Sequence, residues 1–301
     1  RPRSGTYLKP EGHRRLNNQS LMLVTMGFES ELARRFVSLG IQEARKRGWE
    51  PHVVQMERMK DRVLIQALNS GELALILSAP DALTPEIVQA LQDAKGRAVL
   101  VGNRLDAMGI SSIVADDAQG VRLAMKHLQS CGHEHIGVLS SNWGYAIDQI
   151  QIATWKSCMS GVSFCEEDYV LSVEPSRFDS PLEQAYLKMR QWLKHRPPQI
   201  TAMLCLIDQS LPAVIRAIID EGLQVPGDIS LVSFGNTAVS RYANPAVTSV
   251  DPHLALHVQK GVALINNALS ANQDESVQGQ LIQIDPELVV RDSVSQASLC
   301  R

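Results

Sequence analysis

The sequence predicts an α/β protein with two lobes, each built as a parallel sheet covered by helices. Short apolar runs alternate along the chain with amphipathic segments at helical spacing, which is typical of repeated strand–helix units. Polar residues follow the apolar runs, at the strand ends where ligands bind in open parallel sheets. These observations predict two lobes that face a shared crevice, and we expect closure around a ligand as the natural motion.

One stretch, residues 200–252, shows the pattern most clearly. An apolar run over 202–207 ends at Asp208 and predicts a buried strand. Apolar side chains at helical spacing follow and end at Gly222, which predicts a helix. A second apolar run over 229–234 ends at Gly235–Asn236. The stretch is therefore predicted to be a strand–helix–strand unit.

The other elements are predicted in the same way, in chain order. Thr84 and Pro85 mark one helix start, because Thr caps helices and Pro suits their first turn. The predicted strands are 21–25, 51–56, 73–77, 98–101, 112–115, 136–139 and 169–173. The predicted helices are 29–48, 59–70, 84–96, 118–128, 147–159, 180–195 and 254–269. A final extended segment is expected over 281–290.

The composition is that of an ordinary soluble protein, with 45% hydrophobic residues, 20% charged residues and a net charge of -3. This charge gives the whole chain no electrostatic preference for nucleic acid. No apolar run approaches the length of a membrane span, and the start resembles no signal peptide. The five cysteines show no metal-binding spacing and suit a reduced, cytoplasmic setting. The missing initiator Met indicates a fragment of a longer protein.

Several segments resemble the sensor half of LacI/GalR-type bacterial transcriptional regulators. They are the run ITAMLCLIDQSLPAVIRAIIDEGLQVPGDISLVSFGN, the run DDAQGVRLAMKHLQSCGHEHIGVLSS and the closing PELVVRDS. The resemblance extends over most of residues 21–293. It implies a type I periplasmic-binding-protein-like clam that binds a small-molecule effector and forms a homodimer.

Four positions depart from the sugar-binding members of that family. This chain has Asn103 and Gly235 where those members carry Asp, Gln151 where they carry Arg, and Ile207–Asp208 where they carry Asn–Asp. Charged groups of this kind hold vicinal hydroxyls through strong hydrogen bonds. The usual monosaccharide site is therefore not expected here. Either the ligand is different and less polar, or the cleft is a scaffold that binds nothing.

The opening RPRSGTYL resembles the end of the wing in GntR-type winged-helix DNA-binding domains. A DNA-reading head upstream of this fragment is therefore implied, with a frayed basic tail as the alternative. We expect residues 1–19 to be a linker or remnant of that wing, and 294–301 a tail. The N-terminal lobe is expected to comprise 20–112 plus 253–280, and the C-terminal lobe 113–252 plus 281–293.

The expected lining of the crevice consists of residues at strand ends and in the loops that follow. The predicted ligand-binding residues are Phe28, Ser78, Asn103, Trp143, Tyr145, Gln151, Asp208, Gln209, Asn236, Asp251 and His253. Each has a structural alternative: Asp208 as a helix cap, which is favoured, the Asn residues as turn formers, and His253 as hinge packing. Asp116–Asp117 is expected to cap a helix. His133 and His135 lack a third ligand at zinc spacing.

The predicted function is effector binding and dimerisation in a DNA-binding transcriptional regulator, whose operator affinity changes with lobe closure. A periplasmic solute-binding protein of a transporter is the alternative. Catalytic motifs for a nucleophile elbow, a Walker loop or a dinucleotide fingerprint do not occur, so no enzyme, cofactor or metal site is expected. The dimer face is expected to include 32–39 and 64–68, which carry many apolar side chains.

Overall fold

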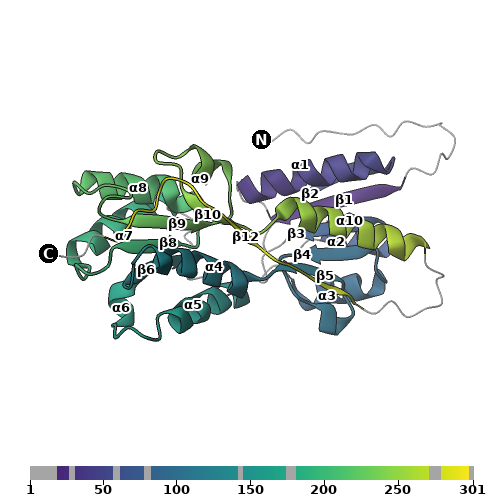
Figure 1. Cartoon of the computed structure of the whole chain (residues 1–301). Helices are drawn as coiled ribbons and strands as arrows, with labels where there is room; N and C mark the ends of the chain where they lie inside the picture. The colour runs from purple at the N-terminus through teal and green to yellow at the C-terminus, as the bar shows by residue number, and fades with distance from the viewer. Residues whose placement is uncertain are drawn as a thin grey trace, which may run out of the picture.

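The computed structural model describes residues 19–26, 31–56, 62–77, 83–141, 145–173, 181–270 and 279–297. It shows two α/β lobes side by side, joined by crossing segments (Figure 1). Each lobe holds a six-stranded sheet, with the orders β11-β5-β4-β3-β1-β2 and β12-β10-β9-β8-β6-β7. The pairings are parallel except that of β10 with β12. The predicted fold class is confirmed.

The N-terminal lobe carries helices on both faces of its sheet. Its strands are β1 (Ser20–Met26), β2 (Glu50–Met56), β3 (Leu73–Leu77), β4 (Ala98–Val101), β5 (Ser112–Ala115) and β11 (Leu281–Ile284). Its helices are α1 (Glu31–Lys46), α2 (Arg62–Asn69), α3 (Pro85–Asp93) and α10 (Leu254–Ser270). Along β1, Leu21 and Leu23 join the core under α1 and α10, whereas Met22 and Val24 join the core under α2 and α3. The strand is therefore apolar on both faces, as a sheet between two helix layers requires.

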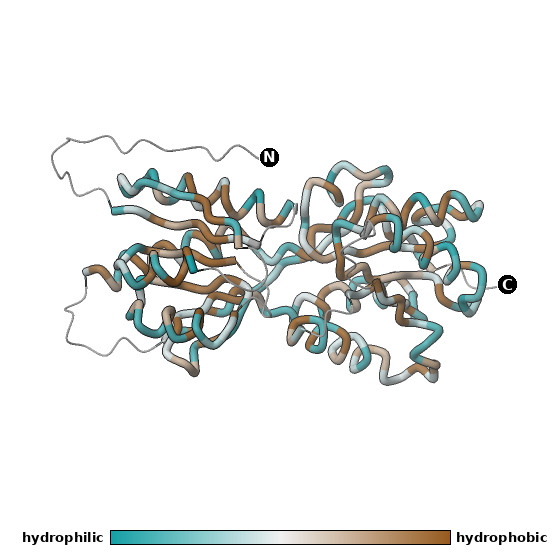
Figure 2. Tube along the Cα trace, turned by 180° about the vertical axis from the view of Figure 1, so that it is seen from behind, coloured by the Kyte–Doolittle hydropathy of each residue, from teal (hydrophilic) through white to brown (hydrophobic). Residues whose placement is uncertain are grey.

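The C-terminal lobe repeats this arrangement around one continuous core. Its strands are β6 (Ile136–Ser141), β7 (Val170–Val173), β8 (Ala202–Cys205), β9 (Ser230–Phe234), β10 (Thr248–Asp251) and β12 (Glu287–Val289). Its helices are α4 (Asp117–Ser130), α5 (Ala146–Cys158), α6 (Glu166–Tyr169), α7 (Pro181–His195), α8 (Leu211–Asp220) and α9 (Ala238–Tyr242). The apolar segments in Figure 2 run along the central strands of both lobes.

Local sequence explains several element ends. Thr84 accepts a hydrogen bond from the backbone N–H of Ile87 and Pro85 opens α3, as predicted. Asp116 accepts from the backbone N–H of Gln119 at the start of α4, which confirms the predicted cap. Gly222 has a left-handed φ of 76° after α8, a conformation that glycine adopts without steric cost.

Two of the three crossings between the lobes lie a few residues later than predicted, whereas the one at 252–253 lies where expected. Strand β5 pairs with β4, and β11 pairs with β5, so both belong to the N-terminal sheet. The predicted lobe boundaries at 112–113 and 280–281 are wrong in this respect. The extended segment over 281–290 is two strands in two sheets, because Pro286 between them has no N–H to donate to a ladder.

Four leucines on α1, α2 and α7 show how these helices pack. Leu64 and Leu68 are fully buried under the sheet, so within 64–68 the surface is formed by Ile65, Gln66 and Ala67. Leu32 and Leu182, in the first turns of α1 and α7, are 38% and 44% exposed. Among the described residues, no helix is long and apolar enough to cross a membrane.

The contact of α1 with β1 gives a stability test. A Cβ atom at Gly40 would lie 2.5 Å from Cδ2 of the buried Leu23. Gly40→Leu is therefore expected to lower the free energy of unfolding by about 1–3 kcal/mol, because the core has no room for the added atoms. Ser38→Leu, on the exposed side of the same helix, should change it by less than about 0.5 kcal/mol. Urea unfolding of both variants checks this, and equal losses would contradict the packing.

Candidate functional site: the crevice between the lobes

The crevice forms where the carboxyl ends of the two sheets face each other. Glu31, at the start of α1, accepts a hydrogen bond from the backbone N–H of Ala238 in α9 at 2.7 Å. Arg35, one turn later, donates to the carbonyl oxygen of Asn236 at 3.3 Å. These bonds join the first turns of α1 to the loop after β9 and the start of α9, which places α1 of one lobe against α9 of the other (Figure 1). The carboxyl end of β1, through α1, and that of β9 are therefore held close together.

Eight of the predicted ligand-binding residues lie in the part of the chain that the structure describes. Phe28, Ser78 and Trp143 fall outside the described residues. The eight are spread over both lobes and the hinge, namely Asn103, Tyr145, Gln151, Asp208, Gln209, Asn236, Asp251 and His253. Their roles as ligand contacts remain predictions, but their geometry separates those that are free to face a ligand from those that hold the fold.

Asp208 does not cap the helix after it, so the favoured interpretation is wrong. Its Oδ2 accepts from the backbone N–H of Thr237 at 2.9 Å and from the Thr237 hydroxyl at 2.6 Å. A short 3-10 turn (Asp208–Ser210) precedes α8 and carries the carboxylate away from the helix start. The Asp208 side chain thus ties the loop after β8 to the loop after β9.

The second oxygen of Asp208 is the feature that points to a ligand. Asp208 is only 5% exposed, and its Oδ1 is buried without a hydrogen-bond partner among the residues that the structure describes. Burial raises the pKa of this carboxyl and Glu31 raises it further, whereas Thr237 and Ser233 act to lower it. The Ser233 hydroxyl donates its proton to Ser249 at 2.7 Å, so it does not satisfy Oδ1. An unsatisfied buried carboxylate oxygen is costly, and such costs concentrate at functional sites.

Asn236 serves the fold with its side chain. Its φ of 46° is left-handed, which agrees with the alternative that it forms a turn. Its Nδ2 donates to Asp251 at 2.8 Å, and its Oδ1 accepts from the guanidinium of Arg291. Arg291 also donates to the carbonyl oxygen of Val247 at 2.6 Å. This network links the loop after β9 to β10 and the C-terminal segment.

Gln151 lies on α5 and brings in a carboxylate that the sequence did not single out. It is 5% exposed and donates to Oδ1 of Asp117 at 3.3 Å. Burial raises the pKa of the half-buried Asp117 to about 7, the Gln151 bond lowers it, and Asp116 raises it slightly. Asp148 on the same helix accepts from the hydroxyl of Ser141 at 2.7 Å. Because Asp117 directly follows the capping residue Asp116, the sequence pattern assigns both to the helix cap and does not show the contact with Gln151.

The other predicted residues lie at the same strand ends. Asn103 follows β4 and is 7% exposed, and Tyr145 is half-buried directly before α5. Gln209 is exposed in the turn after β8. Asp251 ends β10 and His253 lies in the crossing from β10 to α10, as expected for a hinge. His133 and His135 instead contact Thr201 and Tyr169, on the far side of the C-terminal lobe.

The lining is therefore more acidic than the four family departures suggested. Asp117 begins α4 and Asp208 follows β8, so two carboxyls of the C-terminal lobe lie beside predicted ligand-binding residues. Carboxylates accept hydrogen bonds from hydroxyl, amine or amide N–H groups, and a low-dielectric site strengthens such bonds.

The raised pKa of Asp117 predicts a pH dependence of stability. Its folded pKa of about 7 lies above the usual value for Asp, so the folded state holds a proton that the unfolded state releases. Stability from this group should be present at low pH and be lost as the pH rises toward about 7. At about pH 8, Asp117→Asn should raise the free energy of unfolding by roughly 1–2 kcal/mol relative to the parent. At about pH 4 the two proteins should be equally stable, and urea unfolding at both pH values measures the difference. The exposed Asp93→Asn is the control; a pH-independent difference would contradict the assignment.

Comparison with known proteins places this geometry in a family. The profile of the periplasmic binding protein-like domain matches residues 125–294. The HTH-type transcriptional regulator GalR of Escherichia coli (strain K12) is 27% identical over 248 residues, which cover 82% of this chain and 69% of GalR. The HTH-type transcriptional repressor PurR of Haemophilus influenzae (strain PittEE) is 28% identical over 181 residues, 58% of this chain and 51% of PurR. The chain thus spans between half and about two thirds of these relatives.

A solved structure of the lac repressor dimer bound to operator and the anti-inducer ONPF superimposes with a TM-score of 0.73. It is 20% identical and covers 92% of this chain and 94% of that one. At this identity the match shows the fold alone, and it agrees with the two facing lobes described above. The family profile covers more than half of the sequence. The chain belongs to the periplasmic binding protein-like domain family and has the type I fold of the LacI-type sensor domains.

Proposed function

We propose that this chain is the effector-binding and dimerising core of a DNA-binding transcriptional regulator. A small molecule that binds in the crevice would favour the closed arrangement of the lobes, because it contacts both walls at once. In a homodimer this changes the spacing of two DNA-reading heads and so the affinity for operator DNA. The relatives GalR and PurR are named as transcriptional regulators, which favours this function over the solute-binding alternative.

The observation that carries the proposal is the unsatisfied oxygen of Asp208. It lies at the end of β8, close to the loop that Glu31 and Arg35 of the other lobe contact. A ligand hydroxyl or amine at this point would satisfy Oδ1 and reach both lobes. Asp117 and Gln151, on the neighbouring elements α4 and α5, supply further polar contacts. The ligand that fits best is a polar molecule with several hydrogen-bond donors.

Other parts of the proposal rest on the relatives and on the sequence. Operator DNA would be bound by a domain upstream of residues 1–18, which lie outside the described residues. The similarity of RPRSGTYL to a GntR-type wing suggests that this domain is a winged helix. The relatives, which include GalR, do not support a GntR-type domain. A cytoplasmic location and a homodimer follow from the same proposed role. The dimer face would include α1 around Leu32 and the solvent-facing side of α2 within 64–68.

A ligand screen tests the proposal. Thermal unfolding of the chain should be measured with sugars, sugar phosphates, nucleosides and amino acids. A ligand present at about 100 times its dissociation constant adds about 2.7 kcal/mol to the unfolding free energy. Asp208→Asn keeps the size of the side chain but removes its charge, and it should weaken a bound ligand by at least about tenfold.

The matched control is Asp292→Asn, an exposed carboxylate after β12. It should leave the affinity unchanged. A ligand that binds Asp208→Asn as tightly as the parent would place the site elsewhere. The absence of any ligand across the whole panel would support the scaffold alternative instead.

A further inference from the structure

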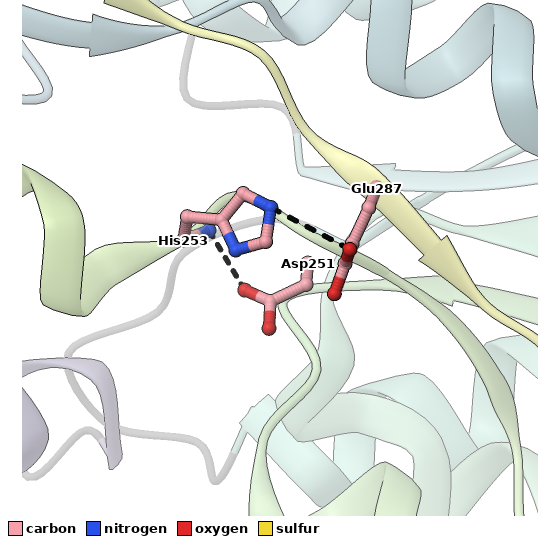
Figure 3. A group of neighbouring side chains, drawn as sticks. All are labelled: Asp251, His253 and Glu287. Carbon is pink, nitrogen blue, oxygen red and sulfur yellow. Dashed lines mark hydrogen bonds and ion pairs between the residues drawn. The ribbon is translucent and has the colours of Figure 1, made fainter.

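Three side chains with metal-ligand chemistry meet at the hinge, and two of them, Asp251 and His253, are among the residues predicted to line the crevice. They are Asp251, His253 and Glu287, and each offers a ligand atom within 4.8 Å of the other two (Figure 3). Asp251 ends β10, His253 lies in the crossing from β10 to α10, and Glu287 begins β12 after the crossing from β11. The cluster therefore gathers donors from two separate crossings between the lobes.

The fold holds one of the three donors, the carboxylate of Asp251, in place. Oδ1 of Asp251 accepts from the backbone N–H of His253 at 2.7 Å, and its Oδ2 accepts from Nδ2 of Asn236 at 2.8 Å. Each oxygen keeps a further lone pair for another partner. Asn236 is fixed in turn by Arg291. Hydrogen bonds of this kind orient the first-shell ligands of metal sites.

Histidine and glutamate face each other across a short gap that solvent can reach. Nε2 of His253 lies 3.9 Å from Oε2 of Glu287, and the two side chains are 32% and 62% exposed. Neighbouring ligands in a tetrahedral zinc site lie roughly 3.3 Å apart, given bonds of about 2.0–2.2 Å. Because the Glu287 side chain is exposed, it can rotate toward this spacing. Asp251 and His253 also line a surface groove of about 500 Å3 between α1 and α10, which provides an entry path.

We propose that Asp251, His253 and Glu287 form a binding site for a borderline divalent cation such as Zn²⁺. One imidazole nitrogen and two carboxylate oxygens match the ligand set of zinc sites that keep a position for water. Calcium and magnesium prefer sites made of oxygen ligands alone. The two carboxylates and a neutral histidine carry a charge of about −2, which a divalent cation neutralises.

Binding at this point would clip together two of the crossings between the lobes. A metal bridge from the β10–α10 crossing to β12 limits the changes in backbone angles that a hinge must absorb. The cation would therefore regulate how readily the lobes close. This consequence rests on the proposed function, whereas cation binding itself does not, so the two can fail separately.

Isothermal titration of the chelator-treated chain with ZnCl₂ tests the site without effector or DNA. Saturable binding of one Zn²⁺ per chain is expected. Glu287→Gln removes the charge of an exposed side chain and should weaken binding by at least about tenfold. His253→Asn should also weaken it by at least that factor, and Asn tolerates the left-handed φ of 57° at this position. Circular dichroism confirms that both variants are folded.

The control is His52→Asn, which removes an exposed imidazole on β2, far from the cluster in sequence. It should bind Zn²⁺ like the parent. No saturable binding, or binding that survives both cluster variants, would overturn the proposal. Equal affinity for Ca²⁺ would overturn the assigned class of cation. As a second readout, Zn²⁺ should slow amide exchange over 253–255 and 287–289 in the parent and not in Glu287→Gln.

Discussion

The arrangement of the whole molecule depends on how the chain crosses between two parallel sheets. Parallel pairing places the carboxyl ends of the strands at one edge of each sheet, and the crossings after β5, β10 and β11 bring these two edges together. Glu31 and Arg35 then reach from α1 to the loop after β9. Without the crossings, each lobe would be an ordinary layered domain with a polar edge. With them, the two edges become walls of one crevice.

The polar side chains at this edge divide into two groups with different tasks. Asn236, Arg291 and Asp251 satisfy one another and hold the loops that the crossings require. Burial raises the pKa of the Asp208 and Asp117 carboxyls. One oxygen of Asp208 is also left without a hydrogen-bond partner among the described residues. The cost of burying a carboxyl without full hydrogen bonding is tolerated where a bound ligand offsets it. The first group therefore shapes the crevice, and the second is the part that we expect a ligand to use.

Sequence patterns predicted the architecture well, because each strand is apolar and each helix is amphipathic. The run over 202–207 and the helix through Leu211 and Ile218 fell where expected, since burial on both faces of the sheet needs those side chains. The boundaries of the strands were predicted less accurately than their existence. The segment 281–290 looked like one extended piece, and only strand pairing reveals that it serves both sheets.

The site was harder to predict, because sequence position does not show which side chains already have partners. Asp208 was assigned to a helix cap on residue type, yet its partner Thr237 lies 29 residues away. Asp117 was hidden beside the capping Asp116, and Glu287 carried no local pattern that linked it to His253. Each of these relations is a contact between distant segments, which only the folded chain creates.

The most direct test of the account is amide hydrogen–deuterium exchange, measured with and without the ligand that the screen identifies. Residues 31–39 of α1 and 234–242 around α9 lie on opposite walls and touch through Glu31 and Ala238. Ligand binding is predicted to slow exchange in both segments together, because closure presses the walls onto one molecule. Slower exchange in only one lobe, or in neither, would contradict a ligand site between the lobes.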